Sequence, residues 1–241
     1  MRIAVISDIH ANQDAFQRVL ADIDRARIDR IVSLGDNIGY GPDPEEVLRT
    51  MQARNIPSVL GNHEMGVLDS KYLSWFNPVA RESLVKTRQM LSGASMRLIS
   101  KMTSLLTIAD CRFVHGFPPN SQFIYFFQVS ANKKRQVLHQ MPERMCFVGH
   151  THTLAIVGFD GQSLETGMLK AGTLNLRRNK KYLLNIGSVG QPRDGNNKAK
   201  YVIWDSIADT LTVRFITYDI ATVVSKIIMA GLPPEHGLRL W

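Results

Sequence analysis

The chain has 241 residues, of which 44% are hydrophobic and 21% charged, which excludes a disordered or fibrous protein and allows a substantial core. No apolar run approaches the roughly 20 residues of a membrane span, and the first is interrupted too early for a secretory leader, so we expect a cytoplasmic protein. The net charge of +8 permits a polyanionic partner, but most basic side chains alternate with acidic ones, which favours solvated surface.

Short apolar runs recur along the chain, and each ends in a polar residue that can bind metal. Their length and β-branched content predict central strands covered on both faces. Cys111 and Cys146 lie within two of these runs, and we expect buried free thiols rather than a disulfide scaffold. In chain order, the five runs lead to Asp8, Asp36, Asn62, His115 and His150.

Helical patterns separate these runs in the first part of the chain. Residues 14–28 carry one apolar stripe at helical spacing. Residues 44–51 predict a second helix, with Asp43 as N-cap and Pro44 at its first position. Strands alternating with helices indicate βαβ units and a mostly parallel sheet.

The rest of the chain has a different pattern of predicted helices and strands. Residues 78–104 are helical in pattern and lack metal-binding motifs, so we interpret 66–105 as a helical insertion, and a third helix is expected at about 130–140. After His152 we expect a more antiparallel half, a closing helix and a tail over 231–241, all in one domain spanning 1–241. The strands expected there are 154–159, 181–184, 201–204 and 210–217, and the closing helix is 219–229.

The polar residues at the strand ends form a candidate metal site. Open α/β sheets bind ligands at the carboxyl ends of their strands. Asp8 and His10, like His150 and His152, are two residues apart, and such positions point to the same side of an extended chain. Imidazole, carboxylate and amide donors without thiolate suit Mn, Fe, Zn or Co better than Ca or Cu(I).

Each motif alone also has a structural interpretation. Gly-Asp-Asn at 35–37 is compatible with an ordinary strand exit, and Gly-Asn-His at 61–63 with a turn held by the asparagine side chain. However, five of the seven histidines fall in these motifs, and this conjunction favours the metal site. The five are His10, His63, His115, His150 and His152.

The ordered motifs resemble the signature of the calcineurin-like metallophosphoesterases along nearly the whole chain. They are Asp8-x-His10, Gly35-Asp36, Gly61-Asn62-His63-Glu64, His115 and Gly149-His150-x-His152. The segments at 35–42 and 187–194 further resemble the small bacterial and archaeal phosphodiesterase branch, which includes diadenosine polyphosphate hydrolases. This resemblance implies an α/β (α+β) fold, namely a four-layer αββα sandwich of two mixed β-sheets flanked by helices.

The resemblance also implies a dinuclear centre and a reaction. Water activated by two divalent ions would hydrolyse a phosphoester bond, with His63 as general acid toward the leaving group; an orienting role for His63 is the alternative. Manganese is favoured among Mn, Fe, Zn, Co and Ni. One ion would be held by Asp8, His10, Asp36 and His152, and the other by Asp36, Asn62, His115 and His150.

Three further residues are candidates for substrate binding. Asn12 can donate to a phosphate oxygen, Asn37 can orient the site beside Asp36, and Arg193 can bind a phosphate from a glycine-rich loop. Glu64 is expected to have a structural role. The aromatic segment 117–128 is interpreted either as a substrate-side wall or as a dimer contact.

We therefore expect a phosphodiesterase or phosphatase whose partner is a small phosphorylated molecule, such as a nucleotide or dinucleoside polyphosphate. A phosphoprotein phosphatase using the same site is the nearest alternative. Net charge alone supports a nuclease, and the complete ligand set argues against a non-catalytic interaction module. We expect neither a membrane nor nucleic acid as partner. Whether the protein forms a homo-oligomer is left open.

Overall fold

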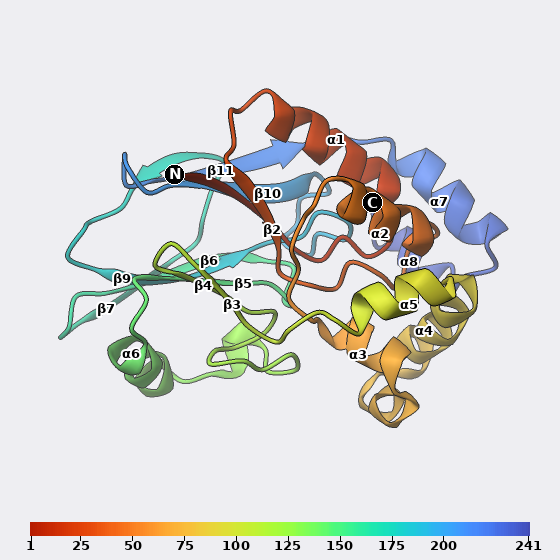
Figure 1. Cartoon of the computed structure of the whole chain (residues 1–241), viewed down its shortest axis with the longest axis horizontal. Helices are drawn as coiled ribbons and strands as arrows, with labels where there is room; N and C mark the ends of the chain where they lie inside the picture. Colours follow the sequence, from red (N-terminus) through yellow and green to blue (C-terminus); the bar gives the residue numbers. More distant parts are fainter.

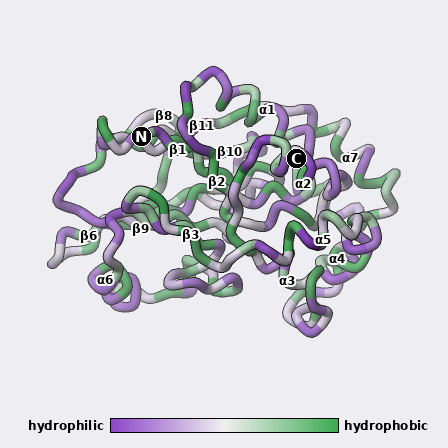
Figure 2. The backbone as a smooth tube through the Cα atoms, viewed as in Figure 1, coloured by the Kyte–Doolittle hydropathy of each residue, from purple (hydrophilic) through white to green (hydrophobic).

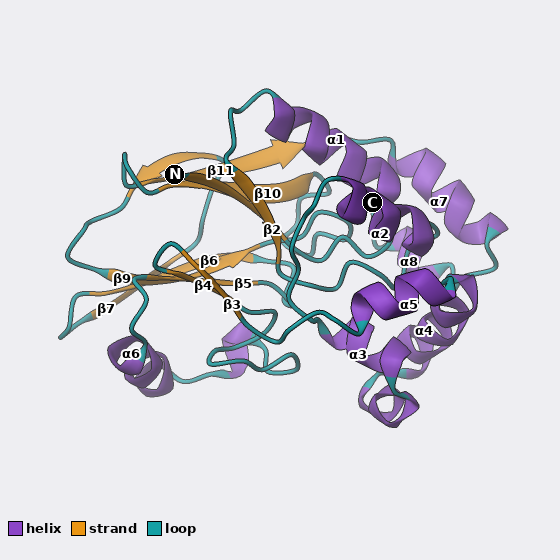
Figure 3. Ribbon diagram, in the orientation of Figure 1, coloured by secondary structure: helices purple, strands orange, loops and turns teal.

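The computed structural model describes all residues, 1–241, and contains two β-sheets that face each other, with helices outside them (Figures 1 and 3). In spatial order, the first sheet contains β2 (Arg30–Ser33), β1 (Arg2–Ile6), β10 (Ala199–Asp205), β11 (Thr210–Ile216) and β8 (Gly172–Asn175). The second contains β3 (Leu106–Ile108), β4 (Cys111–Phe113), β5 (Met145–Val148), β9 (Lys181–Ile186), β6 (Leu154–Phe159) and β7 (Leu164–Gly167).

Both sheets are mixed. The pairs β1–β2, β4–β5 and β5–β9 are parallel, and the six other pairs are antiparallel. The predicted four-layer arrangement of two mixed sheets is therefore confirmed. The strands of the first half pair mostly in parallel, as expected, but they do not form one mostly parallel sheet. The reason is that β1 lies between β2 and β10, and β10 arrives antiparallel from the second half of the chain.

The side chains of β1 show how an apolar run comes to be covered on both faces. Ile3 and Val5 point into the core between the sheets, together with Phe147 and Trp204. Ala4 and Ile6 point outward, into a core shared with the first helices. The central strands are largely hydrophobic, whereas α6 (Ala131–Gln140) is largely hydrophilic (Figure 2).

Helices complete the outer layers. The helices α1 (Gln13–Asp24) and α2 (Pro44–Ala53) share a core with the outward face of the first sheet, and α6 packs through Val137 and Leu138 on the second. No helix has the length and apolar character needed to cross a membrane.

The run at 58–61 does not form the strand predicted for it. Ser58 and Val59 make only isolated bridges, to Ser33 and Thr103 respectively. The five runs are also divided between the sheets, since β1 and β2 belong to one and β4 and β5 to the other. The loops that follow these runs nevertheless meet at one end of the sandwich.

A group of helices lies at that same end (Figure 1). The segment interpreted as an insertion contributes Val67, Leu84 and Ile99 to the core shared with α1 and α2. Residues 231–241, interpreted as a tail, fold back onto α7 through Leu232 and Leu240. The remaining helices are α3 (Asn62–Leu68), η1 (Ser70–Trp75), α4 (Pro78–Met90), α5 (Gly93–Ile99), η2 (Phe126–Gln128), α7 (Ile220–Met229) and α8 (Glu235–Leu238).

Candidate metal centre

The backbone turns sharply where the strands end. Asp8, His10, Asp36, His150 and His152 all have φ between 49° and 67°, in the left-handed region that non-glycine residues rarely adopt. Such conformations cost about 1–3 kcal/mol each and persist where the surrounding structure enforces them, typically at functional sites. The paired motifs therefore converge through left-handed turns, not through the extended chain expected from their two-residue spacing.

Close backbone packing holds these turns together. The Asp8 N–H donates to the Gly35 carbonyl at 3.0 Å, and the His150 N–H donates to the Asp8 carboxylate at 3.1 Å. Gly149 makes this approach feasible, because a Cβ there would lie 1.9 Å from the Ser7 Oγ. Residues more than a hundred positions apart are thereby brought into one cluster.

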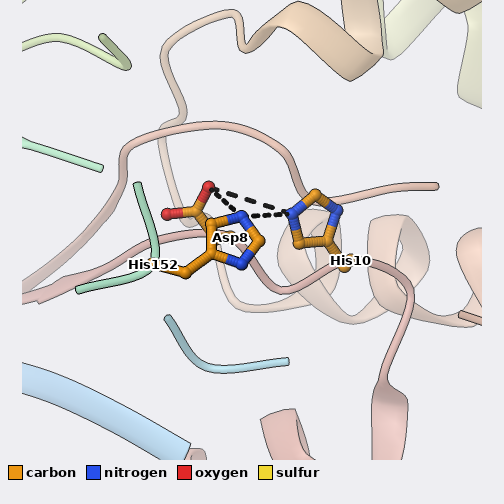
Figure 4. Close-up of side chains that lie close together, drawn as sticks. All are labelled: Asp8, His10 and His152. Atoms are coloured by element: carbon orange, nitrogen blue, oxygen red, sulfur yellow. Dashed lines mark hydrogen bonds and ion pairs between the residues drawn. The ribbon is translucent and has the colours of Figure 1, made fainter. Parts of the chain in front are cut away.

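The first group of donors contains Asp8, His10 and His152 (Figure 4). The Nε2 atoms of the two histidines lie 3.0 Å apart. The Asp8 Oδ1 lies 3.4 Å from the His152 Nε2 and 3.9 Å from the His10 Nε2. All three side chains are buried and present their donor atoms to one point, as ligands of a single ion would.

The second group contains Asp36, His115 and His150, with Asn62 beside it. The His115 Nε2 lies 3.2 Å from the Asp36 Oδ2, 3.1 Å from the His150 Nδ1 and 2.9 Å from the Asn62 Oδ1. The same Asp36 Oδ2 lies 3.9 Å from the His10 Nε2 of the first group. Asp36 therefore stands between the groups, in the position required of a bridging ligand.

Backbone carbonyl groups orient three of the imidazoles. The Nδ1 of His10 lies 3.3 Å from the Ile38 oxygen, that of His115 lies 2.8 Å from the Leu34 oxygen, and that of His152 lies 2.5 Å from the Gln191 oxygen. A proton on Nδ1 satisfies each carbonyl and leaves the Nε2 lone pair facing the carboxylates. This arrangement is the one that metal-binding histidines adopt in proteins.

The electrostatics of the cluster favour a cation. The carboxylates of Asp8 and Asp36 are buried, and their only ion-pair partners are histidines. Burial lowers the pKa of His115, but the carboxylates of Asp36, Asp8 and Glu64 together outweigh this and raise the pKa to about 9. A metal ion can supply the positive charge that the cluster otherwise draws as a proton. The buried Nε2 of His150 also has no hydrogen-bond partner. The residues present thus fit a divalent metal centre.

Glu64 holds the backbone of the loops that carry the cluster. Its carboxylate accepts the N–H groups of Asp36, Asn37 and Gly61 at 2.7–3.0 Å. Burial, and then the Asp36 carboxylate, raise the pKa of Glu64 to about 7. Its geometry agrees with the structural role expected for it.

His63 lies beside the two groups. Its Nε2 is 3.9 Å from the Asp36 Oδ2, so geometry alone also allows it to join His10 and Asp36 around an ion. Tyr40 packs against the rings of both His10 and His63, with centroids 4.5 and 4.3 Å away, and those two rings are themselves 4.6 Å apart. Burial lowers the pKa of His63 to about 4, although the Asp36 carboxylate opposes this effect.

The position of His63 depends on Gly39. A Cβ at Gly39 would lie 2.1 Å from the His63 Nδ1, and the backbone there has φ +83°. We expect Gly39→Ala to displace the imidazole and to lower turnover about 100-fold or more, as loss of a general acid does, while bound metal is retained. Turnover and metal content of the purified variant check this.

Gly161→Ala provides the matched control. Gly161 has φ +98°, and a Cβ there would meet no atom within 4 Å, so this variant tests backbone strain without a collision. Equal losses in both variants would show that strain, not displacement of His63, causes the effect.

The three predicted substrate-binding residues differ in their placement. The Asn12 Oδ1 accepts the Ala15 N–H and its Nδ2 donates to the Gly190 carbonyl, so both ends of the side chain hold backbone. Asn37 is likewise fully buried and is bonded to Ser33, Ser58 and Glu64.

Neither amide lines the cavity at the cluster. Arg193 does line it, and its guanidinium carbon lies 5.8 Å from the centre of the Tyr40 ring. Of the three, Arg193 alone is placed to meet a substrate, and the two asparagines instead position the loops.

Sequence reasoning missed several supporting residues in the loop after β9. Ser188 donates its hydroxyl to the Asp8 carbonyl and accepts the Gln191 N–H, both at 2.8 Å. The buried Lys200 binds Asp194 at 2.8 Å and anchors the far side of this loop. The only signal in the sequence was the glycine-rich segment 187–194, from which Arg193 alone was singled out.

Comparison with known proteins agrees with this architecture. The crystal structure of a metallophosphoesterase from Sphaerobacter thermophilus superposes with a TM-score of 0.84 and 32% identity, covering 100% of this chain and 98% of that one. An uncharacterized protein of Methanocaldococcus jannaschii is 34% identical over 99% of this chain and 97% of its own length. Residues 1–208 match the family description "calcineurin-like phosphoesterase superfamily domain". The fold and the cluster thus define a hydrolase of phosphoric esters that can hold divalent metal. The chain belongs to the calcineurin-like phosphoesterase superfamily.

Two relatives match a shorter part of the chain. A symmetrical bis(5'-nucleosyl)-tetraphosphatase of Delftia acidovorans is 38% identical over 71 residues, which are 28% of this chain and 25% of that protein. Serine/threonine-protein phosphatase 2 of Escherichia coli is 38% identical over 69 residues, which are 28% of this chain and 32% of that protein. The two matches are similar in strength and name different substrates.

Proposed function

We propose that this protein hydrolyses a phosphoester or phosphoanhydride bond of a nucleotide or dinucleoside polyphosphate by means of two divalent ions, with manganese favoured. The observation that carries the proposal is the position of the Asp36 carboxylate between two groups of buried donors. Asp8, His10, Asp36 and His152 would hold one ion, and Asp36, Asn62, His115 and His150 the other. Bound ions would supply Lewis acidity toward the phosphoryl oxygens and generate the nucleophile from water at neutral pH.

The chain's own residues have separate tasks in this proposal. Arg193, at the rim of a cavity of about 190 Å³, binds a phosphate oxygen of the substrate. His63 donates a proton to the departing oxygen, and an anionic phosphate beside the imidazole favours its protonated form. Tyr40 and Phe76 pack against His63 and limit access of water to it.

A phosphoprotein phosphatase is the second candidate, because the match to the Escherichia coli phosphatase is similar in strength to the nucleotidase match. The aromatic side chains that line the cavity, Tyr40, Trp75 and Phe123 among them, favour a substrate with a planar base over a phosphopeptide.

A metal-reconstituted substrate screen tests the proposal. Chelation should abolish hydrolysis, and Mn, Fe, Zn, Co and Ni should be compared for its recovery. We expect bis-p-nitrophenyl phosphate and diadenosine tetraphosphate to be cleaved faster than p-nitrophenyl phosphate and a phosphopeptide. Faster cleavage of the phosphopeptide would select the second candidate, and full activity in the chelated protein would refute both.

A further inference from the structure

Aromatic side chains from two distant segments line the cavity next to the metal cluster. Trp75 ends η1, whereas Phe123 and Tyr125 belong to the loop between β4 and α6. The rings of Trp75 and Phe123 lie 4.5 Å apart, centre to centre, so the segments form one surface. We call Trp75, Phe123 and Tyr125 the aromatic wall. Of the two interpretations of segment 117–128, it favours the substrate-side wall, because Phe123 and Tyr125 line the cavity at the cluster.

The aromatic wall begins at the metal cluster itself. The Tyr125 ring stacks on the His150 imidazole, with centroids 4.1 Å apart and planes 15° apart. Asp36, Asn62 and His150 line the same cavity as the wall. A group bonded to a phosphate at the cluster would therefore reach the wall.

Trp75 stays largely open to solvent, although its ring packs against those of Phe123 and Tyr72. Its side chain is 66% exposed although it lines a cavity and contacts Phe123. A large apolar ring left open at the rim of a polar site is a typical feature of ligand recognition. The ring supplies a flat face, and only a planar ligand group can use it fully.

The charges at the cavity indicate what kind of planar group the aromatic wall binds. Arg193 is the only cationic side chain that lines the cavity, and Asp36, its only carboxylate, faces the donor groups. The wall itself is uncharged, which suits a neutral ring better than a second phosphate. Asn77 lies beside it, and because its Oδ1 accepts the Ala80 N–H, its amide N–H₂ is available to a ring oxygen or nitrogen.

We propose that the aromatic wall binds the nucleobase of the nucleoside attached to the reacting phosphate, with Trp75 as the stacking residue that sets specificity. This proposal rests on the proposed function for the placement of the phosphate. It specifies in addition on which side of the metal cluster the base binds. Stacking of a base on an aromatic side chain is sequence-tolerant, so Trp75 should favour nucleosides in general over non-aromatic esters.

A binding comparison isolates the contribution of the base. AMP and ribose 5-phosphate share the phosphate and the sugar, and differ by the base. Calorimetry with the Mn²⁺-loaded protein should show AMP binding about tenfold tighter, which lies within the usual range for one stacked base. In Trp75→Ala the two affinities should become equal through weaker binding of AMP, and Trp75→Phe should restore most of the difference.

Trp241→Ala is the matched control, because Trp241 is 68% exposed but lines a separate hollow with Arg193 and Arg239. Equal affinities in the wild type, a preference that survives in Trp75→Ala, or a preference lost in Trp241→Ala would each overturn the proposal. A phosphopeptide whose affinity falls as much as that of AMP in Trp75→Ala would also overturn it, since the wall would then not be specific for a base.

The outcome is separable from that of the proposed function. Binding of AMP through Trp75 is measured without turnover, so it can hold in a protein that fails to cleave every ester in the screen. Conversely, hydrolysis of diadenosine tetraphosphate that is unchanged in Trp75→Ala, with equal binding of AMP and ribose 5-phosphate, would preserve the proposed function and refute only the role of the wall.

Discussion

Replacement of Asp36 by Asn is expected to remove metal from both positions and to lower turnover about a thousandfold or more. The Asp36 Oδ2 lies 3.9 Å from the His10 Nε2 and 3.2 Å from the His115 Nε2, so it reaches donors of both groups, and an amide lacks the negative charge that two cations share. Metal ions contribute several kcal/mol of transition-state stabilisation, and about 4 kcal/mol corresponds to about a thousandfold in rate. Elemental analysis of the purified variant, together with kcat, measures both effects.

Asp8→Asn is the informative control, because Asp8 belongs to only one of the two groups. It should lose one ion per chain and keep the other. The shared-ligand assignment would be wrong if Asp36→Asn retained two ions per chain, or if the two variants lost the same amount of metal.

His63→Ala should keep both ions and still lose about 100- to 10,000-fold in turnover, which is the range for a general acid. The loss should be smaller for a p-nitrophenyl ester than for a substrate with a poor leaving group, since p-nitrophenolate departs without a proton. Parallel measurement of metal content and of kcat for both kinds of substrate checks this.

The same experiment decides between two roles for His63. Its Nε2 lies within reach of Asp36, so the imidazole can be placed among the ligands as well as beside the leaving group. Loss of an ion in His63→Ala would identify a ligand. Full metal content with equal losses for good and poor leaving groups would instead indicate an orienting role.

The sequence was informative about the site because the ligands follow buried strands. Apolar runs such as 3–6 and 145–148 are recognisable in the sequence, and a donor residue follows each of them two positions later. The structure brings all seven predicted ligands and His63 to one end of the sandwich. What the sequence did not reveal is how the backbone achieves this, since left-handed turns at Asp8 and His150 leave no periodic signal.

Other features depend on contacts between distant segments and therefore had no local signature. Residues 58–61 resemble the other runs but make only isolated bridges, because pairing depends on which neighbours are free. Asn12 and Asn37 were candidates for substrate binding, yet their side-chain amides bond to groups that the tertiary fold brings near, namely the Gly190 carbonyl for Asn12 and the Ser58 and Glu64 side chains for Asn37. The aromatic wall likewise joins residues 75 and 123, and only the structure shows that they meet.

The hydrogen bonds between the first loop and the segment after β9 have a consequence for biosynthesis. The Asp8 carbonyl accepts hydrogen bonds from Ser188 and Gly190, and β1 pairs with β10. A nascent chain of 160 residues therefore already contains every donor but not the framework that holds them. Such long-range pairing forms late in folding. We therefore expect a chain that ends before residue 188 to bind divalent metal more weakly than the full chain, although it contains every donor.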